Sequence, residues 1–258
     1  MYSKSFFKRA VSLLLMFGLS SAWAGVMLSG TRVILGEKSR EASIPVKNTG
    51  TSPYVVQTWI DAGEGKNKTP LLVTPPLSRL DPGMENILRI MRVGGTLPTD
   101  RESVFWLNVK EIPEKSKEVN VLQVAVRTRI KIFYRPSNLS GQPTEARSKL
   151  KWAVSAGRGG QGAVLKIANA SAYHVTFTGL KVDGNPQEMN GAAMVPPFGE
   201  VAYPLRSIKT PQEIRVSYTT INDYGGETPE ERVRVPVGNE PVALVAELVV
   251  PPTDEAKP

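Results

Sequence analysis

Hydrophobic and polar residues alternate along most of this chain, which is the two-residue period of a β-strand with one buried face. Residues 41–48, with the sequence EASIPVKN, are a clear example, because every second side chain in their centre is apolar. Turn sequences such as Asp81-Pro82-Gly83 separate these runs, since Pro fixes φ and Gly accepts a positive φ. No convincing helical period interrupts the series, so the pattern predicts an all-β protein.

The predicted strands fall into two groups with a polar stretch, residues 136–148, between them. Strands are predicted in the first half at Val26–Leu35, Glu41–Asn48, Tyr54–Ile60, Leu71–Leu80, Asn86–Val93, Val104–Ile112 and Asn120–Phe133. In the second half they are predicted at Lys151–Ala156, Ala163–Asn169, His174–Leu180, Val201–Leu205, Glu213–Thr220 and Val242–Val250. Turn-punctuated series of this kind predict two antiparallel, immunoglobulin-like sandwiches, with domains over residues 25–142 and 143–250.

The stretch of residues 120–136, NVLQVAVRTRIKIFYRP, is too long for an ordinary strand. Fourteen extended residues would reach about 45 Å, whereas strands usually have about five or six residues. Its first half is apolar on both faces, and Leu122, Val124 and Val126 share one of them. Either this is a central, fully buried strand, or it is an edge strand whose outer row another polypeptide covers. An uncovered long apolar edge would aggregate.

Residues 1–24 read as a secretory signal. A charged start containing Lys4, Lys8 and Arg9 precedes the apolar run Ala10–Leu19, and small residues then predict cleavage after Ala24. The apolar run is shorter than the roughly twenty residues of a membrane helix, so we expect an exported, soluble protein without membrane insertion. The alternative is a buried N-terminal helix. Residues 251–258 are predicted to be a disordered tail.

Composition and motifs then exclude several kinds of chemistry. The formal net charge of +8 is mild and is not concentrated in a basic tract, so it does not indicate nucleic-acid binding. The chain has no cysteine and a single histidine, His174, which we expect to be a packed or half-exposed side chain and not a catalyst. A zinc site would need further ligands near this histidine, and a Ser-His-Asp triad of the hydrolase kind would need a GxSxG turn. ATP binding would need a GxxxxGK[ST] loop, and the sequence contains none of these three features. We therefore expect no catalytic residue, no metal and no cofactor.

Four sequence blocks carry a resemblance to a known family. The most specific is LPTDRESVFWLNVKEIP at residues 97–113, and the others are residues 121–136, TPP with RLDPG within 74–83, and INDYGG at 221–226. Together they resemble the periplasmic chaperones of chaperone–usher pilus assembly, of which PapD is the type member. The resemblance spans about residues 26–226 and fades after Glu227. The late cysteine pair of some members is missing.

The resemblance implies a fold, a partner and a binding site. It implies two immunoglobulin-like domains in a boomerang arrangement, and a pilin subunit that lacks its last strand as the partner. Arg32 and Lys131 would bind the C-terminal carboxylate of the subunit, and Leu122, Val124 and Val126 would fill its groove. The alternative for the two cations is that they are solvated strand charges. An outer-membrane usher would receive the subunit, and the free chaperone could cap itself as a homodimer.

The family also implies an ion-pair network between the domains, formed here by Glu102, Arg135 and Asp223. The alternative is three unrelated surface charges. The short connection at residues 111–120 is similar to the short-loop branch of the family. The competing function is that of an exported, immunoglobulin-like fimbrial structural subunit or adhesin.

Overall fold

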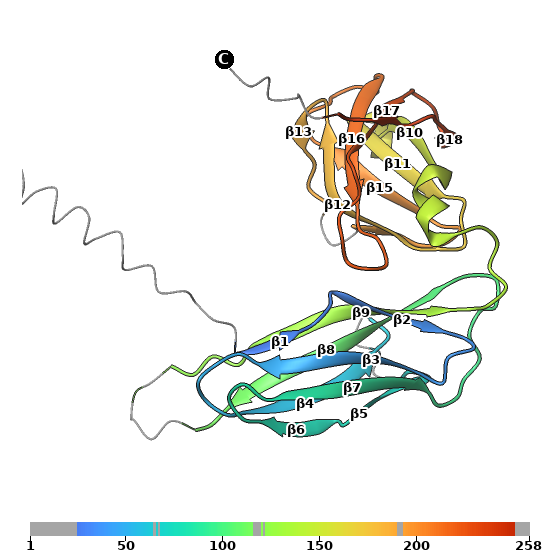
Figure 1. Cartoon of the computed structure of the whole chain (residues 1–258). Helices are drawn as coiled ribbons and strands as arrows, with labels where there is room; N and C mark the ends of the chain where they lie inside the picture. Colours follow the sequence, from blue (N-terminus) through green and yellow to red (C-terminus); the bar gives the residue numbers. More distant parts are fainter. Residues whose placement is uncertain are drawn as a thin grey trace, which may run out of the picture.

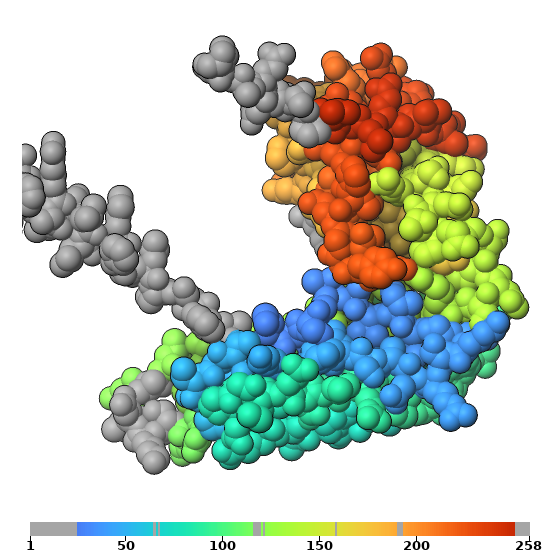
Figure 2. Space-filling model, in the orientation of Figure 1, coloured from blue at the N-terminus to red at the C-terminus, as the bar shows by residue number. Residues whose placement is uncertain are grey.

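The computed structural model describes residues 25–63, 66, 68–115, 120, 122–189 and 193–250. The predicted signal (1–24), the predicted tail (251–258) and Val121 lie outside this range. The described chain forms two β-sandwiches that meet at one end, so that the molecule is bent (Figure 1). Figure 2 shows the same bend as a space-filling surface, with both domains in contact on one side. The prediction of two immunoglobulin-like domains in a boomerang arrangement is confirmed.

The first sandwich packs a four-stranded sheet, in the order β1-β3-β7-β5, against a five-stranded sheet, in the order β2-β9-β8-β4-β6. The strands are β1 (Val26–Leu28), β2 (Arg32–Gly36), β3 (Glu41–Asn48), β4 (Tyr54–Asp61), β5 (Leu71–Thr74), β6 (Leu77–Leu80), β7 (Glu85–Arg92), β8 (Ser103–Pro113) and β9 (Arg127–Arg135). Alternate side chains of both sheets fill the core; among the most buried are Leu35, Val46, Val56, Leu88, Ile90, Leu107 and Ile132. A cis peptide bond joins Thr74 to Pro75 between β5 and β6.

The second sandwich follows a short 3-10 helix, η2 (Pro143–Lys149). One sheet has the order β15-β11-β10-β18, and the other has β13-β12-β16-β17-β19 with β14 also paired to β12. The strands are β10 (Leu150–Ala156), β11 (Ala163–Asn169), β12 (Val175–Val182), β13 (Asn185–Pro186), β14 (Met194–Val195), β15 (Glu200–Leu205), β16 (Ile214–Thr220), β17 (Glu231–Val235), β18 (Val242–Ala243) and β19 (Glu247–Leu248). A second 3-10 helix, η3 (Arg158–Gly160), lies between β10 and β11. The core is centred on the ring of Trp152, which lies 5.0 Å from that of Tyr218 and 6.1 Å from that of Phe177.

The predicted first strand, Val26–Leu35, is wrong as a single element. Its start is β1, which pairs antiparallel with β3, and its end is β2, which pairs parallel with β9 in the opposite sheet. The two sheets face one core, so Leu28, Val33 and Leu35 all pack against it although the chain changes sheet between them. Alternation reports which side chains are buried, and it does not report which sheet holds them. The parallel β2–β9 pair also departs from the predicted purely antiparallel arrangement.

The predicted long strand, Asn120–Phe133, is also shorter than expected, because β9 begins only at Arg127. Residues 122–126 belong to no strand, and Leu122, Val124 and Val126 are 88%, 66% and 45% exposed. A single backbone hydrogen bond joins this segment to β8, from the Glu111 N–H to the Val126 carbonyl (3.0 Å). Since β2 pairs with β9 only from Lys131 onward, β8 is the one strand among the described residues that pairs with residues 127–130. The interpretation of a central, fully buried strand is therefore wrong for this half of the stretch.

Three further differences lie in and before the second domain. The stretch of residues 136–148, predicted as a polar linker, contains most of η2, and the strands β13, β14 and β17 were not predicted. The predicted strand Val242–Val250 forms only the two short pairings of β18 and β19, at the edges of opposite sheets. Between them Leu244 and Ala246 pack against the core, so the alternation arises from a segment that crosses from one sheet to the other.

Two alanine substitutions separate the halves of the long stretch. Ile132→Ala removes a fully buried side chain, and we expect it to lower the free energy of unfolding by about 2–5 kcal/mol. Leu122→Ala removes an apolar side chain that is 88% exposed, and should change it by no more than about 0.5 kcal/mol. Urea denaturation of the purified proteins measures both. A loss for Leu122→Ala equal to that for Ile132→Ala would place this side chain in the protein's own core.

Candidate functional site

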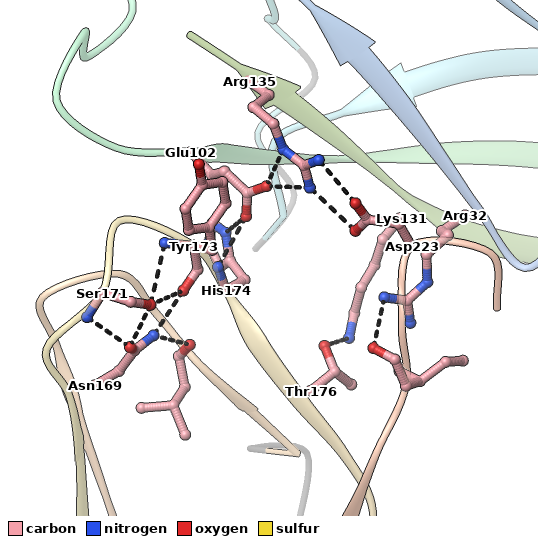
Figure 3. Close-up of polar contacts among 12 residues, drawn as sticks. Arg32, Glu102, Lys131, Arg135, Asn169, Ser171, Tyr173, His174, Thr176 and Asp223 are labelled. Atoms are coloured by element: carbon pink, nitrogen blue, oxygen red, sulfur yellow. Dashed lines mark hydrogen bonds and ion pairs between the residues drawn. The ribbon is translucent and has the colours of Figure 1, made fainter. Parts of the chain in front are cut away.

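The parallel pairing of β2 with β9 places Arg32 directly opposite Lys131. Along β9 the side chains of Ile130 and Ile132 enter the core of the first domain, so those of Lys131 and Phe133 project from the other face. That face meets the second domain, and Figure 3 shows both cations directed toward it. The structure therefore brings the two predicted carboxylate-binding residues together, between the domains.

Lys131 is half-buried and has a single polar contact with the second domain. Its Nζ donates a hydrogen bond to Oγ1 of Thr176 (3.2 Å) and lies 5.6 Å from the ring centroid of Trp106. Burial, and secondly the charge of Arg32, lower the pKa of Lys131 to about 8. No described carboxylate forms an ion pair with it, so this cation is held partly out of water without a compensating charge.

Arg32 is also incompletely paired. Its Nη1 donates a long hydrogen bond to the Ile221 carbonyl (3.4 Å), and its guanidinium lies 5.6 Å from the ring centroid of Phe133. The buried Nε has no hydrogen-bond partner. Burial lowers the pKa of Arg32, against the opposing charges of Asp223 and Glu102. Two adjacent cations with spare donors form a site that suits a carboxylate, whose oxygens accept charge-assisted hydrogen bonds.

Glu102, Arg135 and Asp223 form one ion-pair network across the domain boundary (Figure 3). Arg135 of β9 contacts Oε1 of Glu102 at 2.7 Å through Nη2, and Oδ2 of Asp223 in the β16–β17 loop at 2.7 Å through Nη1. Burial by itself would lower the pKa of Arg135, but the hydrogen bonds and charges of the two carboxylates raise it overall. The structure thus brings together the three residues that the family resemblance grouped.

His174 also belongs to this network through its contacts with Glu102, which the sequence analysis did not predict. The backbone N–H of His174 donates a hydrogen bond to Oε2 of Glu102 (2.8 Å), and the ring Nδ1 lies 3.2 Å from the same oxygen. Its ring packs at 5.4 Å from that of Phe133, and its side chain is 5% exposed. The sequence left a packed and a half-exposed histidine both open; the structure shows the packed one, and no local pattern identified its partner.

The INDYGG loop holds Asp223 in place through local hydrogen bonds. Oδ1 of Asn222 accepts the N–H groups of Tyr224 and Gly226, both at 3.0 Å. Gly225 has a φ of 84°, and a Cβ there would lie 2.6 Å from Oγ1 of Thr31, which precedes Arg32. Only glycine fits this close approach between the loop and the first domain.

The outer face of β9 between Lys131 and the exposed apolar row is also ordered. The guanidinium groups of Arg127 and Arg129 lie 5.0 Å and 4.0 Å from the ring centroids of Trp59 and Trp106. Asp61 holds both, at 3.7 Å from Arg127 and 2.6 Å from Arg129. Burial tends to raise the pKa of Asp61, but the hydrogen bonds from Arg129 and Asn108 lower it. These contacts hold the side chains of Arg127 and Arg129 in place on the stretch before Lys131 (residues 122–130) that does not pair with β2, which is called the free edge below.

A cavity of about 260 Å³ lies between the domains, lined by Arg32, Phe133, Arg135, His174 and Asp223 among others. A larger hollow of about 1090 Å³ lies on the second domain, beside η3 and β15, and contains none of the predicted site residues. In the parts of the chain that the structure describes, no three His, Asp or Glu residues gather where a metal ion could bind. No described helix is both long and apolar enough to cross a membrane.

Comparisons with known proteins bear on the family and the fold of the chain. Residues 25–140 match the family described as "Pili and flagellar-assembly chaperone, PapD N-terminal domain", and residues 145–232 match "Pili assembly chaperone PapD, C-terminal domain". The chaperone protein LpfB of Salmonella typhimurium is 44% identical over 205 residues, covering 78% of this chain and 85% of its own length. The probable fimbrial chaperone YadV of Escherichia coli is 37% identical, covering 80% of this chain and 89% of its own.

Solved structures give the same result. The crystal structure of the YadV chaperone superposes with a TM-score of 0.70 at 34% identity, covering 82% of this chain and all of that one. A chain from the Salmonella enterica structure of the SafA pilin in complex with the SafB chaperone gives a TM-score of 0.72 at 28% identity, covering 84% and 99% of the two chains.

The lowered pKa of Lys131 predicts a pH dependence of stability. Between pH 8 and 10.5 the unfolded chain holds more protons than the folded one, so this lysine makes the free energy of unfolding rise with pH. Below pH 8 it is charged in both states, and burial of the charge lowers stability. We expect Lys131→Met to be more stable than wild type at pH 7, with the difference shrinking toward pH 10. Urea denaturation measures this, with Lys47→Met as the exposed-lysine control, and a difference that stays constant contradicts it.

Proposed function

This chain belongs to the PapD-like family of pilus-assembly chaperones, and we propose that it acts in the periplasm by lending a strand to pilin subunits. It binds a subunit that lacks its last strand, covers the open groove and delivers the subunit to an outer-membrane usher. The work is binding without catalysis or ATP, and the energy for assembly comes from folding and strand exchange. The signal sequence is removed after Ala24, and the mature chain has domains over residues 25–142 and 143–250.

The observation that carries this proposal is the unfinished edge of the five-stranded sheet. Leu122, Val124 and Val126 are spaced by two residues and exposed, and no strand of the described chain lies beside residues 122–126 on the outer side. A strand from a partner placed there would pair with their backbone, while the apolar row would fill alternate pockets of its core. A partner of this kind also explains why an exposed apolar edge is compatible with a soluble protein.

The two cations fix the position of the partner along this edge. The C-terminal carboxylate of the subunit binds Arg32 and Lys131, taking the spare donors and restoring the charge balance of the lysine. From Lys131 back to Leu122 the extended chain spans about 30 Å, so the anchored strand reaches the apolar row with roughly nine residues. The structural neighbour described as a pilin–chaperone complex supports a pilin as the partner.

The ion pairs of Arg135 keep the two domains at one angle. Arg32 and Lys131 of the proposed carboxylate site belong to the first domain. The residues to which they donate hydrogen bonds, Ile221 and Thr176, belong to the second. A change of angle would therefore open the site, and a buried network sets geometry more reliably than it adds stability. When no subunit is bound, the free edge could pair with that of a second copy, as a homodimer. The alternative of a structural subunit or adhesin is not favoured, because both halves match chaperone domains.

Co-expression with a cognate subunit tests the anchor. Arg32→Ala and Lys131→Ala each remove one donor group, and we expect binding to weaken by about 2–5 kcal/mol, so that the subunit is degraded in the periplasm. Arg79→Ala is the control, since it removes an exposed arginine on β6. Protection of the subunit by either anchor variant at the wild-type level would exclude the assigned carboxylate site.

The same co-expression assay tests the role of the exposed apolar row. Leu122→Asp places a charge where the subunit groove is apolar, and we expect it to abolish protection. Leu77→Asp is the matched control, because this leucine is 59% exposed on the far edge strand β6. Equal protection by both variants would show that the row does not enter the client.

Arg135→Met tests the role of the network. It leaves Glu102 buried with only His174 beside it, so we expect a loss of about 3–5 kcal/mol from the interdomain contacts. Small-angle scattering should show a broader range of domain angles than for wild type. Arg79→Met, which breaks the exposed Arg79–Asp81 pair, should cost at most about 1 kcal/mol and leave the scattering unchanged. An unaltered profile for Arg135→Met would mean that other contacts set the angle.

A further inference from the structure

The first domain contains a buried carboxylate that neither the core nor the proposed client site uses. Glu111 of β8 is 6% exposed, and its Oε2 has no hydrogen-bond partner. The backbone N–H of Val26, at the start of β1, is close enough to this carboxylate to lower its pKa, against the effect of burial. No described lysine, arginine or histidine forms an ion pair with it. A buried carboxylate with one neutral donor is costly, so a missing partner is expected.

The residue before Val26 lies where such a partner would arise. Gly25 is buried, and its carbonyl accepts the N–H groups of Thr49 (2.9 Å) and Gly50 (3.2 Å). A Cβ on Gly25 would lie 2.6 Å from the ring of Tyr54, so the backbone is closely packed at this point. Bond lengths place the nitrogen of Gly25 less than about 4 Å from that of Val26, which already contacts Glu111.

We propose that Glu111 is a binding site for the chain's own processed amino terminus, the ammonium group on Gly25. The inference rests on the proposed removal of residues 1–24, because before cleavage the nitrogen of Gly25 is a neutral amide. Cleavage converts this amide into an ammonium, which has three donors and a positive charge. One donor pairs with Oε2 of Glu111, while a hollow of about 360 Å³ beside Gly25 lets water take the others.

The electrostatics of Glu111 agree with this assignment. Burial raises the pKa of Glu111, against the opposing effect of the Val26 N–H. A fixed cation next to the carboxylate reverses this effect, because an opposite charge favours the ionised form. The ion pair therefore stabilises the first domain only in the exported, processed chain.

The site also lies next to the edge that receives the client. The N–H of Glu111 donates to the carbonyl of Val126, the last residue of the apolar row. In Figure 1, β1 and the segment before β9 lie at the same end of the first domain. Glu111 of β8 would therefore contact both the amino terminus, through its carboxylate, and Val126 in the free edge, through its backbone N–H.

A cycle of four proteins tests the proposal. Wild type and Glu111→Gln are each prepared with Gly25 as the first residue, by a protease that leaves no extra residue, and again with a Ser-Ala extension before Gly25. With Gly25 first, we expect Glu111→Gln to lower the midpoint of thermal unfolding by about 4 °C or more. With the extension, the same substitution should have little effect or raise the midpoint, because no ammonium is present at the site.

The pKa of the α-amino group, measured by NMR on the forms that begin with Gly25, gives an independent readout. It should be higher in wild type than the usual value of about 7.7–8.0, and should return to that value in Glu111→Gln. An equal effect of the substitution in both forms, or an α-amino pKa that does not depend on Glu111, overturns the proposal. Mass spectrometry of the periplasmic protein tests the cleavage site separately, so a different first residue there would contradict the proposed processing and not the chemistry of the Glu111 site.

Discussion

The structure depends on β9, which has a neighbouring strand on both sides over only part of its length. From Lys131 onward β9 has β2 on one side and β8 on the other, whereas the chain before Lys131 has β8 alone. The interior of the first domain is filled without Leu122, Val124 or Val126. The core of the first domain is therefore complete without the exposed row, which leaves these side chains available for the client binding that we propose. In the function that we propose, this separation of stability from binding allows a client to bind and leave without unfolding the chaperone.

For the two cations, the carboxylate binding that we propose follows from their unfavourable environment in the free protein. Arg32 and Lys131 are adjacent and partly buried, and no described carboxylate pairs with either. A solvated pair of charges would gain little from a carboxylate, because water already satisfies both. Partial burial makes the anion more favourable, and contacts with the second domain hold both side chains in place. The network of Arg135 then matters because it fixes the domain that provides those contacts.

Much of the fold and part of the site could be predicted from the sequence. Runs such as β3 and β11 begin and end where the alternation and the turn residues indicate. The grouping of Glu102, Arg135 and Asp223 was implied by the family resemblance and not by any local pattern, and the structure brings these side chains together. The single strand Val26–Leu35 was a wrong prediction, as was the length of Asn120–Phe133, because strand bounds depend on which neighbour is present. His174 and Thr176 were missed as contacts of the site, since they lie far along the chain from their partners.

The sequence by itself determined the all-β class, the two-domain pattern, the faces that are buried and the residue types available for binding. These properties are local, because a period of two residues and the chemistry of a turn are complete within a few positions. Only the tertiary structure decided that β2 lies parallel to β9, that the free edge begins before Lys131 and that Glu111 lies beside Val26. Each of these depends on which strands become neighbours. Alternation specifies the face of a side chain but not the strand beside it, so strand pairing is settled only when the two sheets close over a shared core.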